Sequence, residues 1–342
     1  MIRILFLLVL PLMAQAETVR VATFNTELSR DGPGLLLRDI RRGDAQVQAV
    51  AQVLAAVNPD IVALQGVDWD FGGQTLAALT EQLREAGLDY PHQFAARPNS
   101  GLETGLDMDG DGRTDGPGDA QGWGKYTGHG GMAVLSRYPI NQDEVQDFSP
   151  LLWRDLPDAQ LPVLDGQPYP SEDAQQVQRL PSVAQWVVPV ETPFGPVDLM
   201  TFHAAPPVFD GPEDRNGLRN HDEIQVWSHV LDGRLGSAPK GPYVIAGDAN
   251  QDPTRGEGRK QAIKALLSHP LLQDPQPRDA TGDLATVTWK ATGDMRVDYV
   301  LPSARWTVRD SGVYWPDTGT EGRKAAQAAS RHRLVWVDLE ME

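Results

Sequence analysis

Strand-like and helix-like patterns alternate along this chain, and this alternation limits the folds that it can adopt more than any other feature. The segments 17–25 and 61–65 are rich in β-favouring residues, and apolar residues recur at helical spacing between 45 and 57. Asp44 is placed to cap that helix, and Asn58 with the proline after it is placed to end it. Alternating strands and helices are typical of α/β layers.

The same alternation returns in the second half of the chain. Strands are predicted at 242–247, 296–303 and 334–340, and a helix is predicted near 261–269. Segments 186–190 and 197–203 have the pattern of a β-hairpin. Because the two arms of a hairpin are antiparallel, the sheets cannot be purely parallel.

The first residues of the chain have the pattern of a secretory signal. Arg3 precedes a short apolar run that ends in Ala-Gln-Ala, the small residues that a signal peptidase needs. This run is too short to span a bilayer. We therefore expect a signal peptide at 1–16, a mature protein that is secreted or periplasmic, and no stable insertion into a membrane.

Charge and residue usage exclude several classes of protein. The formal net charge of -17 repels nucleic-acid backbones and anionic membranes unless cations intervene, which excludes a broad basic groove. The chain has no cysteine, so disulfides, thiol nucleophiles and thiolate zinc sites are excluded. Strands of similar character flank a Gly/Asp-rich insertion at 99–131, and we expect residues 17–342 to form a single domain that acts as a monomer.

Several of the predicted strands are followed or flanked by a polar side chain. These side chains are Asn25, His203, Asp248, Asn250, Asp298 and His332. Ligands of layered α/β folds bind at the ends of strands, where side chains from distant segments meet. Each residue alone has an ordinary interpretation as a turn residue or a buried hydrogen-bonded group. Together they predict one site.

Seven strings carry a resemblance to a known family. They are ATFN, PDIVALQ, GMAVLSRYPI, TFHAAPP, IAGDAN, RVDYVLPS and SRHRLVWVDL. In this order they resemble the endonuclease/exonuclease/phosphatase superfamily, which has the fold of pancreatic deoxyribonuclease. The string 208–227 also resembles a secreted bacterial branch of it. The resemblance implies an α/β fold, a four-layer sandwich of two mixed β-sheets flanked by helices, and metal-assisted hydrolysis of a phosphate ester.

The chemistry that this resemblance implies suggests a role for each matching residue. An imidazole titrates near neutral pH, so His332 is the expected base that takes a proton from water. Asp298 is expected to fix the other ring nitrogen of that imidazole. His203 is expected to donate a hydrogen bond to a non-bridging phosphate oxygen.

The remaining matching residues would hold the substrate or a metal. Asn250 is expected to hold the phosphoryl group or the attacking water, and Asp248 to order that water or support the leaving group. Asn25 is expected to meet Mg²⁺ or Mn²⁺ through its amide oxygen, a hard ligand suited to these ions.

Two positions depart from the family pattern. Gly66 stands where the family has its principal metal-binding glutamate, and Arg331 stands where it has an aspartate. One repair is that Asp68, Asp70 or Glu27 supplies the missing carboxylate, and another is that Arg331 itself clamps the phosphate. A third interpretation is a calcium-stabilised binding protein that kept the fold and lost hydrolysis.

The segment 107–119 has the spacing of a calcium-binding loop. The acids Asp107, Asp109, Asp111 and Asp115 occupy positions 1, 3, 5 and 9 of such a loop. A glycine occupies position 6, where a sharp turn is needed, but position 12 is a glycine instead of glutamate, with Asp119 next to it. We predict that Ca²⁺ binds here and orders the segment. The alternative is a solvated acidic loop.

Further substrate contacts are predicted in the segment after His203. Arg215 and Arg219 are candidates for binding a phosphate group, and a helix is expected to begin near Asp222 and Glu223. The predicted partner is a phosphate ester. Nucleic acid, small phosphorylated solutes and phospholipid head groups stay open, because a bound cation can bridge an acidic protein and an anionic substrate.

Overall fold

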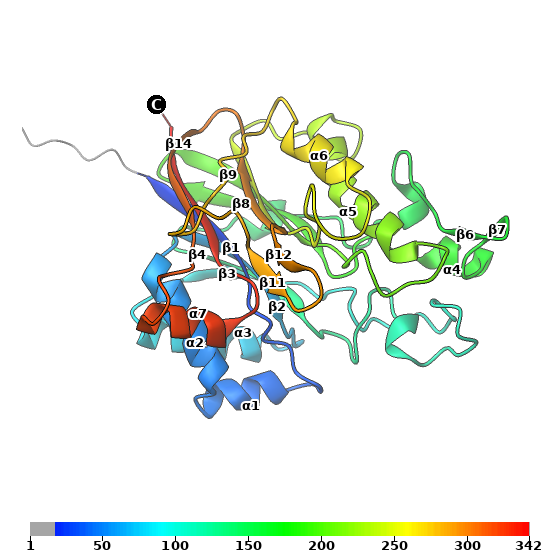
Figure 1. Cartoon of the computed structure of the whole chain (residues 1–342), viewed down its shortest axis with the longest axis horizontal. Coiled ribbons are helices and arrows are strands. Elements are labelled where there is room, and N and C mark those ends of the chain that lie inside the picture. The colour runs from blue at the N-terminus through cyan, green and yellow to red at the C-terminus, as the bar shows by residue number, and fades with distance from the viewer. Residues whose placement is uncertain (1–17, 342) are drawn as a thin grey trace, which may run out of the picture.

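Two β-sheets packed face to face form the centre of the protein, and helices cover the outer face of each sheet (Figure 1). The computed structural model describes residues 18–341. The signal peptide predicted at 1–16 lies outside the described residues. Within the described part of the chain, no helix is long and apolar enough to cross a bilayer.

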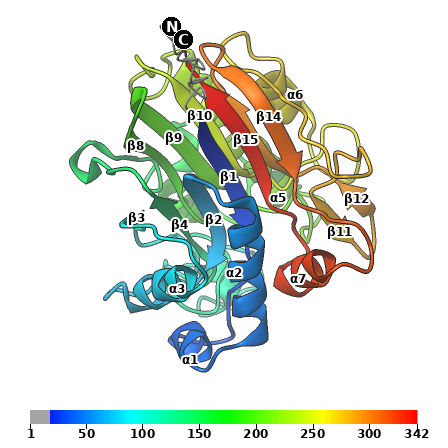
Figure 2. The same ribbon diagram turned by 90° about the vertical axis from the view of Figure 1, so that its left-hand side faces the viewer.

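The first sheet has six strands and is mixed. In spatial order they are β14 (Thr307–Val313), β15 (Val335–Glu340), β1 (Val19–Asn25), β2 (Ile61–Val67), β4 (Gly131–Ser136) and β3 (His92–Phe94). Strand β1 runs parallel to β2 and antiparallel to β15. The last of these strands in the sequence therefore lies inside the sheet, directly beside the first (Figure 2).

The second sheet has five strands and is also mixed. In spatial order they are β13 (Asp298–Pro302), β10 (Tyr243–Asp248), β9 (Gly195–His203), β8 (Gln185–Thr192) and β5 (Gln146–Asp147). Strand β10 is parallel to β9 and antiparallel to β13. The predicted hairpin is confirmed as β8 and β9. Two short ribbons pair β11 (Val287–Trp289) with β12 (Gly293–Met295) and β6 (Val163–Leu164) with β7 (Gln167–Pro168).

The larger helices divide between the two outer faces. Those on the first sheet are α1 (Leu35–Arg41), α2 (Ala45–Val57), α3 (Gln74–Glu85) and α7 (Glu321–Ala329), and those on the second are α5 (Arg215–Leu231) and α6 (Gln261–Leu267). Helices, sheet, sheet and helices make four layers, which confirms the predicted α/β sandwich of two mixed sheets.

Three layers of buried apolar side chains join these four layers. Val50 and Leu54 of α2 pack on the first sheet, and Ile224 and Trp227 of α5 pack on the second. Trp186 of β8 lies between the sheets and is fully buried. Removing this apolar surface from water contributes roughly 25 cal/mol per Å² to the stability of the sandwich.

Helix α2 begins and ends where the sequence predicts. The carboxylate of Asp44 accepts the N–H groups of Gln46 at 3.0 Å and Val47 at 3.2 Å, which satisfies two donors that have no partner inside the helix. Asn58 ends the helix in the left-handed region, with φ of 56°. Asparagine tolerates this conformation better than most residues.

Helix α5 begins earlier than the sequence predicts. The prediction of a start near Asp222 is wrong, because the helix begins at Arg215, about two turns earlier. Asp222 accepts a hydrogen bond from the indole of Trp153 at 2.7 Å, and Glu223 accepts the N–H of Ala205 at 2.6 Å. These acids therefore bind groups outside the helix and do not cap its start.

Two long segments, 99–131 and 150–181, hold each other in place beside α5 (Figure 1). Their regular elements are short: η1 (Pro117–Asp119), η3 (Trp153–Asp155), β6, β7 and α4 (Glu172–Val177), with η2 (Gln142–Glu144) between the two segments. The amide of Gln178 donates to the carbonyl of Gln121 at 2.8 Å, across the two segments. The hydroxyl of Tyr169 donates to the carbonyl of Asp109.

Candidate active site

The polar strand ends meet at one edge of the sandwich. Asn25 ends β1, His203 ends β9, Asp248 ends β10 and Asp298 begins β13. The pairing register sets Asp248 opposite both His203 and Asp298. His332 lies just before β15, opposite the residue that begins β11. The fold thus gathers residues that are up to 307 positions apart in the sequence.

His332 and Asp298 form a buried pair. The ring Nδ1 of His332 lies 2.9 Å from one carboxylate oxygen of Asp298 and 3.1 Å from the other. The hydroxyl of Thr286 accepts the backbone N–H of Asp298 at 3.0 Å, which fixes the strand that carries it. With Nδ1 turned toward the carboxylate, Nε2 is the ring nitrogen left to exchange a proton with water or substrate.

The charge of these neighbours changes the acidity of His332. Burial alone would lower the pKa of His332, but the carboxylates of Asp298 and Asp248 outweigh it and raise this pKa to about 9. These two carboxylates therefore favour the protonated imidazole. Positive charge bound at Asp248 would favour the neutral ring that a base needs.

Asp248 is fully buried and both of its oxygens have donors. One oxygen accepts the amide of Asn25 at 2.8 Å, and the other accepts the backbone N–H of Asn250 at 2.7 Å. Burial first, and the nearby charge of Asp298 second, raise the pKa of Asp248. A possible ligand atom of each of Asp248, Asp298 and His332 lies within 4.8 Å of the others, so this cluster could hold a metal ion.

His203 and Asn250 complete the edge. The Nε2 of His203 lies 3.5 Å from the nearer oxygen of Asp248, and burial lowers the pKa of His203, which favours the neutral ring. The side-chain amide of Asn250 donates to the carbonyl of Ala204 at 2.9 Å, and its backbone is left-handed with φ of 48°. Its side chain is thus fixed at the edge where the histidines lie.

The sequence of the chain matches the model of a known protein family. The model of the Endonuclease/Exonuclease/phosphatase family matches residues 22–332, which is most of the chain. The chain belongs to this family. Endonuclease/exonuclease/phosphatase proteins are generally phosphoric ester hydrolases, and enzymes of the family use divalent metals. No curated protein matches the sequence.

Solved structures of family members share the fold. An endonuclease/exonuclease/phosphatase from Beutenbergia cavernae is 20% identical, with a TM-score of 0.55 over 95% of this chain and 72% of that one. A family protein from Leptotrichia buccalis is 16% identical, with a TM-score of 0.55 over 94% and 100%. The catalytic domain of human Nocturnin with a bound sulfate anion is 16% identical, with a TM-score of 0.52 over 95% and 94%. At these identities the likeness shows the fold alone.

Gly66 has no room for the metal-binding glutamate of the endonuclease/exonuclease/phosphatase family. It lies where the pairing of β2 with β4 shifts register, and its φ is 71°, a left-handed conformation that favours glycine. A Cβ at this position would lie 2.8 Å from Oδ1 of Asn25 and 2.9 Å from the backbone N of Glu27. A side chain at position 66 would therefore require Asn25 and the backbone of Glu27 to move.

Glu27 and Arg331 form an ion pair next to this glycine. The guanidinium Nε of Arg331 donates to Glu27 at 2.7 Å, and its backbone N–H donates to the other carboxylate oxygen at 2.8 Å. The guanidinium lies over the ring of Trp289, 4.4 Å from its centroid. The hydroxyl of Ser330 donates to the backbone carbonyl of Asn25 at 2.7 Å. This hydroxyl ties the residues before His332 to the end of β1.

Trp289 and Ser330 are residues at the site that the sequence does not single out. The pattern of aromatic residues predicts that Trp289 belongs to the core, but its ring is only partly buried and packs edge-on against His332 with centroids 5.3 Å apart. Its place on a strand gives no signal of this contact. For Ser330, the only hint in the local sequence is its place just before Arg331 and His332, and this hint is weak.

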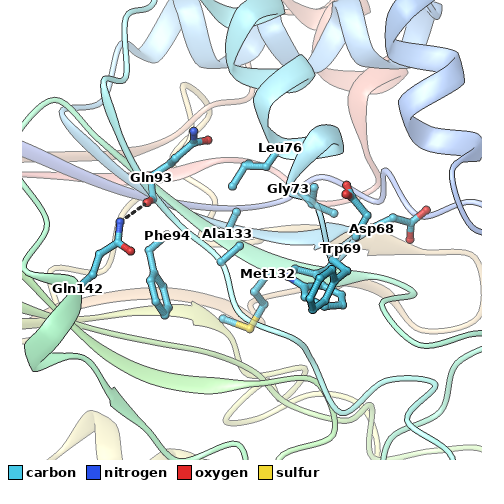
Figure 3. Close-up of a pocket in the computed structure, with 13 residues that line it drawn as sticks. Asp68, Trp69, Gly73, Leu76, Gln93, Phe94, Met132, Ala133 and Gln142 are labelled. Carbon is cyan, nitrogen blue, oxygen red and sulfur yellow. Dashed lines mark hydrogen bonds between the residues drawn. The ribbon is translucent and has the colours of Figure 1, made fainter.

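The carboxylates of Asp68 and Asp70 bind backbone groups of loops and of a helix. The oxygens of Asp68 accept the N–H of Gly130 at 2.8 Å and the N–H of Arg30 at 2.9 Å. Asp70 accepts the N–H of Thr75 at 2.7 Å in the first turn of α3. Both acids line a cavity of about 320 Å³ between α3 and strands β3 and β4 (Figure 3). They therefore hold loops and a helix start.

Arg219 is buried among backbone carbonyls, so its position favours a structural role over the predicted contact with substrate. Its side chain is 3% exposed, and its guanidinium donates to three backbone carbonyls. Those of Leu180 and Gln121 lie at 2.8 Å and 2.5 Å. The charged and titratable groups nearest Arg215 include Tyr169 and Asp109, beside the acidic loop. Arg215 donates to Gln178 at 3.1 Å.

The acidic loop brings together a different set of residues from the one predicted. Asp107, Asp109 and Asp119 each place an oxygen within 4.8 Å of the others. Asp111 and Asp115 lie outside this group: Asp111 accepts the N–H of the next-but-one residue at 2.8 Å, and the side chain of Asp115 is 77% exposed. Asp119, next to the twelfth position, is turned inward by the turn at 116–119 and accepts the N–H of Met108 at 3.0 Å.

Proposed function

We propose that this protein is a metal-assisted phosphoric ester hydrolase. The observation that carries the proposal is the buried pair of His332 and Asp298, 2.9 Å apart, beside Asp248 at the edge where the strands end. A histidine with its orienting carboxylate is the arrangement that general base catalysis needs. The family supports the class of reaction.

The residues of the site have complementary tasks in this proposal. His332 takes a proton from the attacking water at Nε2, and Asp298 stabilises the cation that forms. His203, neutral and close to Asp248, donates a hydrogen bond to a non-bridging oxygen of the phosphoryl group. Asn250 holds the phosphoryl group or the water in line, and Asp248 orders the water or supports the leaving group.

The donors at this edge fit a hard divalent cation, which we propose is Mg²⁺ or Mn²⁺. Asn25 and Asp248 offer amide and carboxylate oxygens, the ligands that these ions prefer. Asp248 and Asp298 lie together in a buried place, where a bound cation offsets the repulsion between them. When bound, the cation supplies positive charge that stabilises the phosphoryl oxygens.

Export is part of the proposal and rests on the predicted signal at residues 1–16. The substrate class within phosphate esters also rests on the sequence. A net charge of -17 favours small phosphate esters over long nucleic acids unless cations screen the repulsion.

Hydrolysis assays with and without a chelator test the proposed function. We expect turnover of a generic phosphodiester or monoester, lowered about 10²-fold or more by EDTA and restored by Mg²⁺ or Mn²⁺, because a metal ion contributes several kcal/mol to transition-state stabilisation. Nicking of supercoiled plasmid measures nuclease activity in parallel. Absence of turnover on all three substrates with every metal would contradict the proposal and favour a binding protein on the same fold.

We also propose that the acidic loop holds Ca²⁺ in a structural role. Asp107, Asp109 and Asp119 converge, and burial together with the three neighbouring acids raises the pKa of Asp109. A cation would offset this crowding of negative charge. It would also order a glycine-rich segment whose backbone entropy is costly to fix.

Calcium should therefore stabilise the folded protein. We expect EDTA to lower the Tm by about 5 °C and Ca²⁺ to restore it, since a ligand at about 100 times its Kd contributes about 2.7 kcal/mol. The Asp109→Asn variant should lose this response. The matched variant Asp115→Asn, which changes an exposed acid outside the group, should keep it. A response that is equal in both variants would show that the loop is not the calcium site.

A further inference from the structure

The backbone around Gly66 leaves no room for a side chain at that position, and Glu27 lies directly beside it. A Cβ at Gly66 would lie 2.9 Å from the N and 3.2 Å from the Cα of Glu27, and 2.8 Å from Oδ1 of Asn25. The loop that follows β1 thus fills the space that a side chain at position 66 would enter. Glu27 itself has φ of 50°, a conformation that non-glycine residues adopt rarely.

The carboxylate of Glu27 faces the site. Its backbone N–H donates to Oδ1 of Asn25 at 3.2 Å, and one of its oxygens accepts the hydroxyl of Ser330 at 3.2 Å. The same hydroxyl donates to the backbone carbonyl of Asn25 at 2.7 Å and accepts the backbone N–H of His332 at 3.0 Å. This carboxylate therefore shares one space with the residues that would act on a phosphate.

The positively charged side chain of Arg331 binds this carboxylate. Its backbone N–H, Nε and Nη2 all donate to Glu27, so the arginine serves both oxygens. Burial alone would raise the pKa of Glu27, but these hydrogen bonds lower it. The side chain of Arg331 is 63% exposed and rests on Trp289. The guanidinium can thus leave the carboxylate without unfolding its surroundings.

We propose that Glu27 is the metal-binding carboxylate of this site and that Arg331 competes with the divalent cation for it. This inference rests on the proposed metal-assisted function and adds the ligand that Gly66 does not supply. When a cation binds Glu27 together with Asn25 and Asp248, the guanidinium is released. It stays on the rim near Trp289, where a planar guanidinium can bind a phosphate oxygen.

Titration of Mn²⁺ into the full chain by calorimetry tests this competition. All proteins carry Asp109→Asn, so that the acidic loop does not contribute. We expect Arg331→Gln to bind Mn²⁺ about tenfold more tightly than the parent, which corresponds to about 1.4 kcal/mol. We expect Glu27→Gln to bind it at least tenfold more weakly. In the double variant the gain from Arg331→Gln should disappear, because the carboxylate for which the arginine competes is gone.

Two controls separate this result from other causes. Arg84→Gln removes an exposed arginine that pairs with Glu81 on the surface of α3, and it should leave Mn²⁺ affinity unchanged. Circular dichroism and Tm measurements verify that each variant is folded, and Arg331→Ala repeats the test with a smaller side chain. Unchanged or weaker binding by both Arg331 variants, a gain that persists without Glu27, or no Mn²⁺ uptake by the parent and the Arg331 variants would each overturn the proposal. Because binding is measured, a lack of turnover would count against the proposed function alone.

Discussion

Replacing His332 with alanine is expected to lower kcat for phosphate-ester hydrolysis by about 10²–10⁴-fold, the usual contribution of a general acid or base. The imidazole is buried against Asp298 at 2.9 Å, and no water can take its place with the same basicity. Steady-state kinetics on the substrate found in the hydrolysis assays measure the effect. KM should change much less than kcat, since His332 acts on the water and not on the phosphate.

Asp298→Asn is the companion to this variant, because it keeps the shape of the side chain and removes its charge. It should also lower kcat, and it should lower the pKa of His332 since that carboxylate is the strongest factor that raises it. If His332→Ala and Asp298→Asn both keep more than about a tenth of the parent kcat, His332 is not the base.

The raised pKa of His332 also provides a test of folding. A pKa of about 9 in the folded state, above the ordinary value of 6.5, means that protonation stabilises the fold. This contribution is complete below about pH 6.5 and is lost as the pH rises toward 9. Urea unfolding at pH 6.5 and 9, without metal, should show a smaller pH effect in His332→Ala than in the parent.

Replacing Arg219 with alanine is expected to lower the free energy of unfolding by about 3–5 kcal/mol, the cost of breaking a buried charged group away from its partners. The change leaves three buried carbonyls without their donor. It also leaves the buried carboxylate of Glu223 without the positive charge that lowers its pKa. Urea unfolding monitored by tryptophan fluorescence measures the loss.

A surface arginine offers the matched control for Arg219. Arg84→Ala removes a side chain that is 62% exposed and pairs with Glu81, and it should cost no more than about 1 kcal/mol. If Arg219→Ala keeps its stability within that limit and instead raises KM for the substrate, the original prediction of a substrate contact is right and the structural role is wrong.

Local patterns account for the parts of the fold that the sequence predicts. The cap at Asp44, the stop at Asn58 and the hairpin of β8 and β9 depend on residues close together in the chain. The start of α5 at Arg215 does not depend on nearby residues alone. The hydrogen bonds that hold Arg219 of this helix in place come from residues about 39 and 98 positions away. Such contacts leave no periodic signal.

The residues of the site also divide into those that the sequence predicts and those that it does not. His332, Asp298 and Asp248 could be predicted because each flanks a strand and matches a family string. The pair of Glu27 and Arg331 spans 304 positions, and neither residue matches a family motif. Asp119 was visible only as a neighbour of the expected twelfth position. Its inward direction depends on the short 3-10 turn, which spacing alone does not reveal.

The position of β15 in the sheet determines when the site can form during synthesis of the chain. This strand is the last in the described sequence, yet it lies between β14 and β1, and His332 immediately precedes it. A nascent chain that stops short of these residues lacks both an inner strand and the imidazole. The proposed active site can therefore form only after β15 has been synthesised and has paired with β14 and β1.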